Sequence, residues 1–579
     1  MNAVNTYWIQ TLGCRVNHYE AEQLAALLRG HGLTEAGSAD GADLRIVHSC
    51  SVTVQAASKS RQAVRRLAKL RVIGSEGTSF SGDEGCAVGG DCGAHHAHGE
   101  TNPEGTRHAL LAEGEAASTP GGDAGGRRAR VVVTGCWATS DADEARALAG
   151  VDAVLGHNQD VAAELGRLLT QWEAADEDES RPTTGLGIGH ATRGESDSRE
   201  GNDGMMIGPI GPAPREPIPV YASKASSLNF VNGKLEADEN WLLHKTSGNP
   251  ARSGGSAGMV RLPMLGERQA AHQRAFLKVQ DGCDAHCTYC IIPRLRPGLW
   301  SKPVDEAVDE ARRLVDAGHR EIVLTGIFLG AYGQPTALRR RQGENGGARE
   351  LGRLVEALCT RVTGLGRLRL SSLEPGDVTA ELVDVLRAHR QVVPHFHLPL
   401  QSGSDAILRK MNRQYTRGEF WDMAARLNEA FDRPAITTDI IVGFPGETDE
   451  EFERTVEVAE RVGFVHTHAF SYSPRPGTAA ARWTKRWVRG PVVNQRIERL
   501  VGIAARTSEQ FRRGFFGEVV EVLVERSDSD VDWRHGRSER YFDVAFCAPA
   551  GVTTGSVVRV RVNSVEGERT VGTVAEVIG

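Results

Sequence analysis

The 579-residue sequence lacks several features, and each absence excludes a class of protein. No apolar run approaches the ~20 residues that a membrane-spanning helix needs. The first residues do not form a basic segment followed by an apolar block, so no secretion signal is indicated. Neither sign of charge dominates, since 68 basic side chains stand against 75 acidic ones, which excludes a uniformly basic nucleic-acid-binding protein. We therefore expect a cytoplasmic protein without a membrane segment.

Aromatic residues are also scarce, at 6% of the chain, whereas glycine is abundant, with 66 residues. Residues 72–128 and 172–272 are polar and glycine-rich, without sustained periodicity, and residues 338–350 are a shorter stretch of the same kind. Such segments cannot bury enough apolar surface to offset the entropy lost on ordering, so we predict disordered insertions or linkers. They leave three domains, at residues 1–171, 273–507 and 508–579.

The first two predicted domains alternate strands with helices, a pattern typical of parallel sheets covered by helices. The first domain has strand-like runs at residues 7–11, 44–47 and 130–133. The second has six, at residues 275–279, 321–325, 367–371, 395–398, 436–442 and 464–470. Six strand–helix units are too few for a closed eight-stranded barrel, so we expect an open, partial (β/α)6 barrel with its chemistry at the C-terminal strand ends.

The third domain has a different pattern. Short β-branched runs at residues 519–524, 541–546, 556–562 and 570–577 are separated by Gly, Asp and Ser. This pattern predicts a small antiparallel β-barrel.

Cysteine carries the most specific signal in the sequence. Cys283, Cys287 and Cys290 form a CxxxCxxC motif directly after the first strand of the six-unit domain. Three thiolates at this spacing can bind three irons of a 4Fe–4S cluster and leave the fourth iron open for a chelating ligand. The alternative is zinc, for which His286 is the local candidate as fourth ligand.

A second set of cysteines is spread along the first domain. Cys14, Cys50 and Cys136 each follow a predicted parallel strand. Because the carboxyl ends of parallel strands meet at one edge of a sheet, we predict a second three-thiolate cluster there. The alternative is that all three are ordinary small core residues.

Several segments, in this order, make a family resemblance specific: TLGCRVNHYEAE, VVTGC, LKVQDGCDAHCTYCIIP, LSSLEP, HLPLQSGS and TDIIVGFPGET. Together they resemble the radical S-adenosylmethionine methylthiotransferases, and most closely the branch that acts on N6-threonylcarbamoyladenosine in tRNA. The pieces GEVVEVLVER and SERYFDVAF resemble the RNA-binding TRAM domain of that family. The resemblance implies an N-terminal α/β domain, a radical S-adenosylmethionine partial barrel and a TRAM-like β-barrel.

The resemblance also implies a mechanism with two 4Fe–4S clusters. The Cys283/Cys287/Cys290 cluster would bind S-adenosylmethionine and cleave it reductively to a 5′-deoxyadenosyl radical, which takes the hydrogen from carbon 2 of adenine. The Cys14/Cys50/Cys136 cluster would hold the sulfur that is delivered. The implied contacts to S-adenosylmethionine are Tyr289, Thr325, Gly326, Glu374, Gln401 and Gly443. Tight turns at the two glycines and a helix-start carboxylate at Glu374 are the structural alternatives.

The implied partners are the anticodon loop of tRNA, an electron donor and a sulfur source. The basic runs at residues 61–71 and 482–489 are candidates for phosphate contacts, although a solvated helix face explains the first equally well. Related activities would act on isopentenyl-adenosine in tRNA or on an aspartate of a ribosomal protein. A different class of function is a non-catalytic, zinc-containing RNA-binding protein.

Two segments depart from the family pattern. Where the family carries Arg-Gly and then a charged run, residues 296–301 read Arg-Pro-Gly-Leu-Trp-Ser, so three polar or charged positions are missing. The first insertion contains Cys86, Cys92, His95, His96 and His98, for which we favour solvated side chains over a small zinc site. Cys359 and Cys547 are interpreted as structural thiols.

Overall fold

The chain was analysed as a computed structural model, which describes residues 4–72, 128–179, 230–231, 234–235, 262–266, 273–339, 346–527 and 532–578. The residues of two predictions lie outside the described parts of the chain: Cys86, Cys92, His95, His96 and His98, and most of residues 172–272. The chain divides into two units, one of Met1–Glu177 with Val260–Gly579 and one of Asp178–Met259. In the second unit, strands β6 (Phe230–Val231) and β7 (Lys234–Leu235) pair antiparallel. The fold and both cysteine sites described next belong to the first unit.

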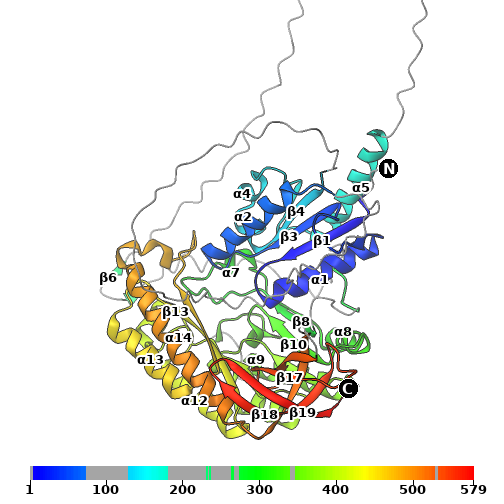
Figure 1. Cartoon of the computed structure of the whole chain (residues 1–579). Coiled ribbons are helices and arrows are strands. Elements are labelled where there is room, and N and C mark those ends of the chain that lie inside the picture. Colours follow the sequence, from blue (N-terminus) through cyan, green and yellow to red (C-terminus); the bar gives the residue numbers. More distant parts are fainter. Residues whose placement is uncertain are drawn as a thin grey trace, which may run out of the picture. The chain divides into compact units, whose positions relative to one another are not determined.

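The N-terminal part is a five-stranded sheet in the order β2-β1-β3-β4-β5, and all its strands are parallel. Its strands are β1 (Thr6–Thr11), β2 (Thr34–Glu35), β3 (Leu44–Ser49), β4 (Arg130–Gly135) and β5 (Ala153–Leu155). One face packs against α1 (Arg15–Gly30) and α5 (Val161–Glu179), and the other against α2 (Val54–Lys69), α3 (Cys136–Ser140) and α4 (Ala142–Arg146) (Figure 1). The central strand β3 is buried along its whole length because helices cover both faces.

The middle part contains six parallel strands that form two sheets, ordered β11-β10-β8-β9 and β12-β13-β14. The six are β8 (Arg274–Asp281), β10 (Glu321–Gly326), β11 (Arg367–Leu370), β12 (His395–His397), β13 (Ala435–Val442) and β14 (His466–Ser471), and the short β9 (Trp300–Ser301) pairs antiparallel to β8. Two isolated bridges, Leu368↔Val392 and Ser372↔His397, connect the two sheets. The predicted partial barrel is therefore confirmed.

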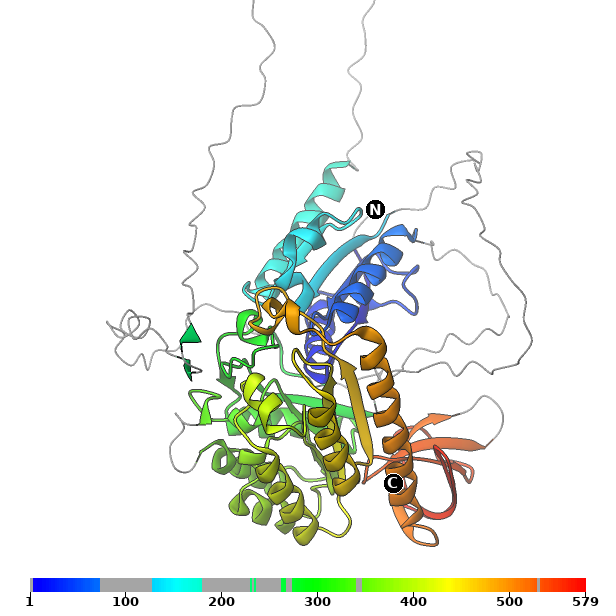
Figure 2. The same ribbon diagram turned by 90° about the vertical axis from the view of Figure 1, so that its left-hand side faces the viewer.

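Helices follow the strands and supply the other half of the barrel core. They are α7 (Ile292–Leu295), α8 (Val304–Asp316), α9 (Gly346–Arg361), α10 (Ala380–Ala388), α11 (Asp405–Lys410), α12 (Arg417–Ala430), α13 (Asp449–Val462) and α14 (Gly490–Arg513). Helix α14, orange in Figure 2, leads from the barrel into the C-terminal strands. No helix in the described parts of the chain is both long and apolar enough to cross a membrane.

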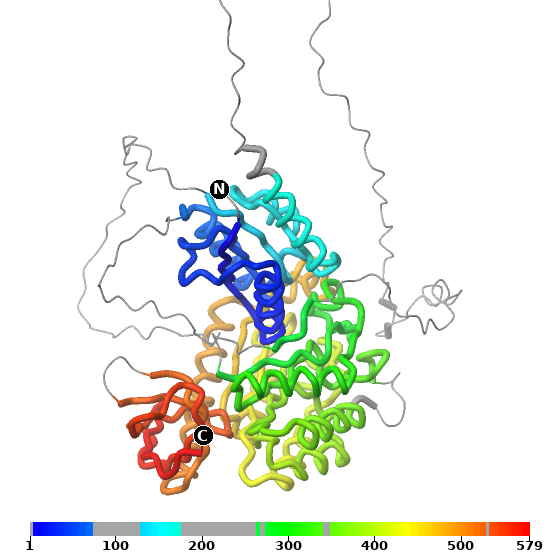
Figure 3. The backbone as a smooth tube through the Cα atoms, turned by 90° about the vertical axis from the view of Figure 1, so that its right-hand side faces the viewer, coloured from blue at the N-terminus to red at the C-terminus, as the bar shows by residue number. Residues whose placement is uncertain are grey.

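The C-terminal part is a closed five-stranded barrel in the order β15-β16-β17-β19-β18, orange to red in Figure 3. Its strands are β15 (Val519–Ser527), β16 (Trp533–Ser538), β17 (Asp543–Cys547), β18 (Val557–Glu566) and β19 (Arg569–Val577). The sequence predicted four strands and missed β16, because WRHGRS is polar and carries no β-branched run. The expectation of a purely antiparallel barrel was also wrong, because β17 and β19 pair in parallel.

Two predicted insertions are shorter than expected. Helix α5 continues through residue 172, where the Trp172 side chain is 7% exposed and belongs to the N-terminal core. In residues 338–350, Arg339 forms ion pairs with Glu374 and Asp377, and helix α9 begins at residue 346. Specific tertiary partners, which composition does not reveal, order these ends.

The C-terminal barrel packs closely against the partial barrel. Tyr541 stacks on His395 of β12, with ring centroids 4.2 Å apart, and its hydroxyl accepts a hydrogen bond from Arg15 of α1 at 3.2 Å. Beneath it lies the buried ion pair of Arg369 and Glu321, whose side chains are both 0% exposed. Removing the tail would uncover this pair, so point variants are better probes of its function than deletion.

Candidate iron–sulfur sites

The CxxxCxxC loop begins where β8 ends. Gly282, with φ of +77°, turns the chain there, and a Cβ at this position would overlap the carbonyl oxygen of Gly298. The backbone N–H of Cys283 donates to the carbonyl of Arg296 at 3.2 Å. The start of the cysteine loop thus contacts Arg296 and Gly298, which belong to the segment that departs from the family pattern.

Its three thiols lie in a region of low dielectric. Burial raises the pKa of Cys283 and of Cys290 to about 12, and it raises the pKa of Cys287 despite a nearby arginine. The N–H of Ala285 donates to the Cys283 sulfur at 3.4 Å. Metal ligation must therefore release protons from these thiols, as is usual for thiolate sites.

The donor set of three thiols fits a 4Fe–4S cluster. Among the residues that the structure describes, no three His, Cys, Asp or Glu side chains converge on one metal position. In a 4Fe–4S cluster each thiolate binds its own iron, so three thiolates need not meet at one point. His286 turns the loop with φ of +52° and is exposed, which gives the zinc alternative no support from this side chain.

Arg413, a residue that sequence reasoning missed, contacts the loop from the turn after α11. Its guanidinium donates to the Cys287 sulfur at 3.3 Å and to the Tyr289 hydroxyl at 3.5 Å, and it also pairs with Glu374. Glu374 further accepts from Arg339 at 3.3 Å. Glu374 is at the same time the N-cap of a 3-10 turn, so the structural alternative for this carboxylate holds as well. Only the tertiary structure brings Arg413 to the cysteines.

The remaining predicted contacts lie after successive barrel strands, on the same edge as the cysteine loop. Thr325 and Gly326 end β10, where the register against β8 shifts. Gln401 follows β12 and adopts φ of +60°, and Gly443 follows β13 with φ of +75°. The Gly443 N–H donates to the carboxylate of Glu447 at 2.7 Å, so this glycine does form a tight turn. Their contacts to S-adenosylmethionine remain predictions.

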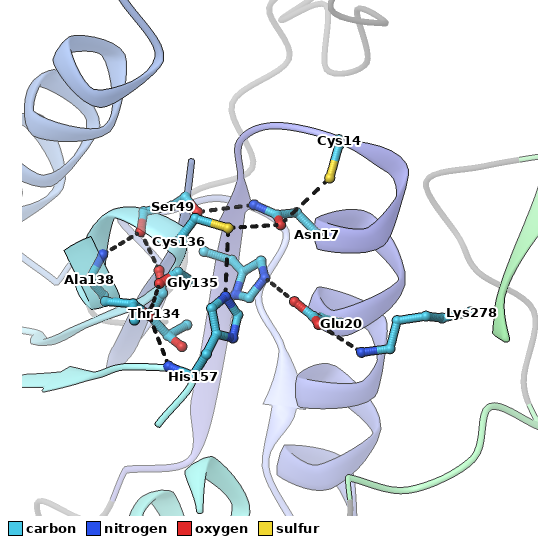
Figure 4. A network of polar contacts seen from close by, with 12 residues as sticks. Cys14, Asn17, Glu20, Ser49, Thr134, Gly135, Cys136, Ala138, His157 and Lys278 are labelled. Atoms are coloured by element: carbon cyan, nitrogen blue, oxygen red, sulfur yellow. Dashed lines mark hydrogen bonds and ion pairs between the residues drawn. The ribbon is translucent and has the colours of Figure 1, made fainter. Parts of the chain in front are cut away.

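The second cysteine set gathers at the carboxyl edge of the N-terminal sheet. Cys14 directly precedes α1, Cys50 directly follows β3, and Cys136 begins α3 after β4. The side-chain amide of Asn17 donates to the carbonyl of Ser49 at 3.0 Å, which turns its oxygen toward the Cys14 sulfur at 3.9 Å and the Cys136 sulfur at 4.0 Å (Figure 4). The predicted juxtaposition of thiols is therefore present, with one amide between two of them.

A glycine lines this second site. Gly13 has φ of +111°, and a Cβ on it would lie 2.9 Å from the Cys50 sulfur, so a larger residue at this position would press on the cysteine. Cys136 is 3% exposed, and burial raises its pKa to about 12. Three thiols beside a glycine, whose lack of a side chain leaves room next to the sulfurs, fit a bound cluster.

Comparison with known proteins identifies the family of this chain. The profile of the radical SAM superfamily matches residues 277–459, and that of the uncharacterized protein family UPF0004 matches residues 6–91. Threonylcarbamoyladenosine tRNA methylthiotransferase MtaB of Bacillus subtilis is 29% identical over 96% of this chain and 93% of its own. The protein of the same name from Chlamydia pneumoniae is 38% identical over 52% of this chain and 67% of its own. The chain belongs to the radical S-adenosylmethionine methylthiotransferases.

A relative with a different printed substrate also matches this methylthiotransferase. The tRNA-2-methylthio-N(6)-dimethylallyladenosine synthase of Anaplasma phagocytophilum is 35% identical over 51% of this chain and 66% of its own.

Membership in the radical SAM superfamily carries with it S-adenosylmethionine and a 4Fe–4S cluster. Among the residues that the structure describes, two cysteines lie outside both sites, and Cys359 on α9 and Cys547 at the end of β17 occupy helix and strand positions.

Four charged side chains of the methylthiotransferase join its two cysteine-bearing parts, and we call them the inter-site charge cluster: Glu20, Lys278, Asp281 and Arg296. Lys278 binds Glu20 at 2.8 Å and Asp281 at 2.9 Å, and Arg296 binds both carboxylates as well. Although burial acts to raise it, the cations of Arg296 and Lys278 hold the pKa of Glu20 well below its usual range. Two anions and two cations thus balance each other in a buried position.

Substituting Gly282 by alanine should empty the CxxxCxxC site of iron. The new methyl group meets the carbonyl of Gly298, and the left-handed φ costs on the order of 1–3 kcal/mol. Iron and sulfide analysis together with thermal unfolding would measure both effects. Gly318→Ala is the matched control, because Gly318 has φ of +100° but no atom within 4 Å of its Cβ position. Equal iron loss in both variants would show that backbone strain alone is responsible.

Proposed function

We propose that this chain adds a methylthio group to carbon 2 of N6-threonylcarbamoyladenosine beside the anticodon of tRNA. The observation that carries the proposal is the pair of three-cysteine sites, each at the carboxyl edge of its own parallel sheet and linked by the inter-site charge cluster. A relative with this printed activity aligns with 96% of the chain. We place the enzyme in the cytoplasm, with an electron donor and a sulfur source of unassigned identity.

We assign one 4Fe–4S cluster to Cys283, Cys287 and Cys290, and a second to Cys14, Cys50 and Cys136. When bound, these groups and S-adenosylmethionine supply the reductive radical chemistry and carry the sulfur. The chain's own residues hold and shield them. The Arg413 guanidinium stabilises negative charge at Cys287, and the apolar side chains packed against the loop exclude water.

The modified nucleoside that the enzyme forms identifies its substrate. The reconstituted protein is incubated with S-adenosylmethionine, a sulfide source, a reductant and one of two tRNAs, carrying either N6-threonylcarbamoyladenosine or isopentenyl-adenosine. We expect the methylthio product, detected by mass spectrometry of digested nucleosides, from the first tRNA only. Product from the second tRNA alone would establish the isopentenyl-adenosine activity of the Anaplasma relative instead.

We further propose that tRNA phosphates bind a basic rim, defined as Arg482, Lys485, Arg486 and Arg489, together with the TRAM-like domain at residues 508–579. All four rim side chains are exposed, and none has an ion-pair partner among the residues that the structure describes. The rim adjoins the cluster loop, because the Ala480 N–H donates to the Thr288 carbonyl at 2.9 Å. The other basic run, on α2, has Arg61 paired with Glu144 and Arg66 bound to Gln10, which favours a structural role.

Replacing the four rim residues by glutamine should weaken tRNA binding and make it less salt-dependent. Each lost phosphate contact removes a released counterion, so the slope of log K against log salt should become shallower by up to about 3. Titration of labelled tRNA at several salt concentrations measures this, while cleavage of S-adenosylmethionine should persist. A control variant neutralises four exposed arginines on or beside outer helices: Arg312, Arg353, Arg387 and Arg390. Equal slopes for the two variants would contradict the rim assignment.

A further inference from the structure

Arg296 is the residue of the altered loop that remains from the family pattern, and it occupies an unusual position. Its side chain is 3% exposed. Nη1 and Nη2 each donate to one oxygen of Glu20 at 2.8 Å, which is a two-point fork onto helix α1. Nη1 also donates to both oxygens of Asp281 at 2.9 Å, at the end of β8. A planar guanidinium with five donors is the side chain suited to such a fork.

These bonds connect Arg296 to the elements that carry the cysteines of the N-terminal site, and one residue, His157, links it to Cys136. Glu20 lies on α1, which Cys14 precedes, and its carboxylate also contacts His48 of β3 at 3.3 Å, two residues before Cys50. Nη2 of Arg296 lies 2.9 Å from Nε2 of His157. This histidine nitrogen lies 3.7 Å from the Cys136 sulfur, and Figure 4 shows both residues.

The backbone of the same residue holds the other site. The Arg296 carbonyl accepts the N–H of Cys283, the first cysteine of the CxxxCxxC loop, and the carbonyl of Gly298 lies against Gly282. One residue therefore binds the radical loop with its backbone and the N-terminal cysteine site with its side chain. Since the reacting carbon must be reached from both sites in turn, a misplacement of about 1 Å between them can cost on the order of 100-fold in rate.

We propose that Arg296 is a positioning residue that sets the separation of the two clusters, so that radical formation and sulfur delivery act on the same adenine. This inference rests on the two-cluster assignment of the proposed function. In this proposal the loop does not need the charged run of the family. The missing positions follow Arg296, and the fork onto Glu20 and Asp281 needs none of them.

Three variants separate geometry from charge and from folding. Arg296→Lys keeps the cation but lacks the planar fork. Arg296→Met leaves Glu20 and Asp281 with one cation, Lys278, and destabilises the fold. The double variant Glu20→Gln/Arg296→Met removes one charge of each sign and should fold with near wild-type stability. The matched control is Arg369→Met, which also breaks a buried ion pair, at a site that contacts neither cysteine loop.

The readout is the electron-spin dipolar coupling between the two reduced clusters, measured beside S-adenosylmethionine cleavage and product formation on tRNA. Wild type and Arg369→Met should give one narrow distance distribution. Arg296→Lys and the double variant should broaden or shift it, retain cleavage and lose at least tenfold in methylthiolation. A wild-type sample that contains only one cluster would contradict the two-cluster assignment. Two clusters at an unchanged distance in Arg296→Lys and in the double variant, with methylthiolation retained, would overturn the role of Arg296.

Discussion

Replacing Cys283, Cys287 and Cys290 together by alanine should abolish cleavage of S-adenosylmethionine and leave about half of the iron and sulfide. In our assignment these three thiolates hold three irons and leave the fourth iron open for S-adenosylmethionine, so their loss should remove this step. Anaerobic reconstitution, metal analysis and chromatography of 5′-deoxyadenosine give the result. Because cleavage precedes transfer, methylthiolation of tRNA should disappear as well.

Cys359→Ala provides the control for the loss of a buried thiol. Cys359 lies on α9 and is 7% exposed, but it belongs to neither cysteine site. This variant should keep the iron content and the cleavage rate of the wild type. Full iron content in the triple variant, or cleavage at the wild-type rate, would refute the assignment of the first site.

The complementary variant, with Cys14, Cys50 and Cys136 replaced by alanine, should separate the two half-reactions. It should retain about half of the iron and cleave S-adenosylmethionine without transferring a methylthio group. The reason is that its three thiols come from a different sheet and that the CxxxCxxC loop keeps all its own contacts. Nucleoside mass spectrometry and the yield of 5′-deoxyadenosine, measured on one sample, give both values.

Alanine is the suitable replacement at this second site. Cys50 and Cys136 are 5% and 3% exposed, and a serine hydroxyl at either position would risk remaining unpaired in the core. Circular dichroism should show that the sheet survives. A methylthiolated product from the triple variant would show that these cysteines hold no group essential to transfer.

The sequence alone predicted the elements on which both sites depend. Apolar runs that alternate with helical patterns predict the parallel strands, and the position of each cysteine at a strand end follows from them, because parallel strands end at one edge. CxxxCxxC is a local motif, so its chemistry could be predicted from eight residues. The same local reasoning failed for β16, whose polar sequence forms a strand only because β15 and β17 flank it.

Only the tertiary structure decided the contacts between residues that lie far apart in the sequence. Arg296 and Glu20 lie 276 residues apart, and Arg413 and Cys287 lie 126 apart. No periodicity or spacing encodes such pairs, because they depend on how two separately formed sheets dock. From the sequence, Arg296 is only the residue of this loop that the family pattern retains. Burial against two carboxylates, which requires both domains to be folded, is what gives Arg296 its place between the sites.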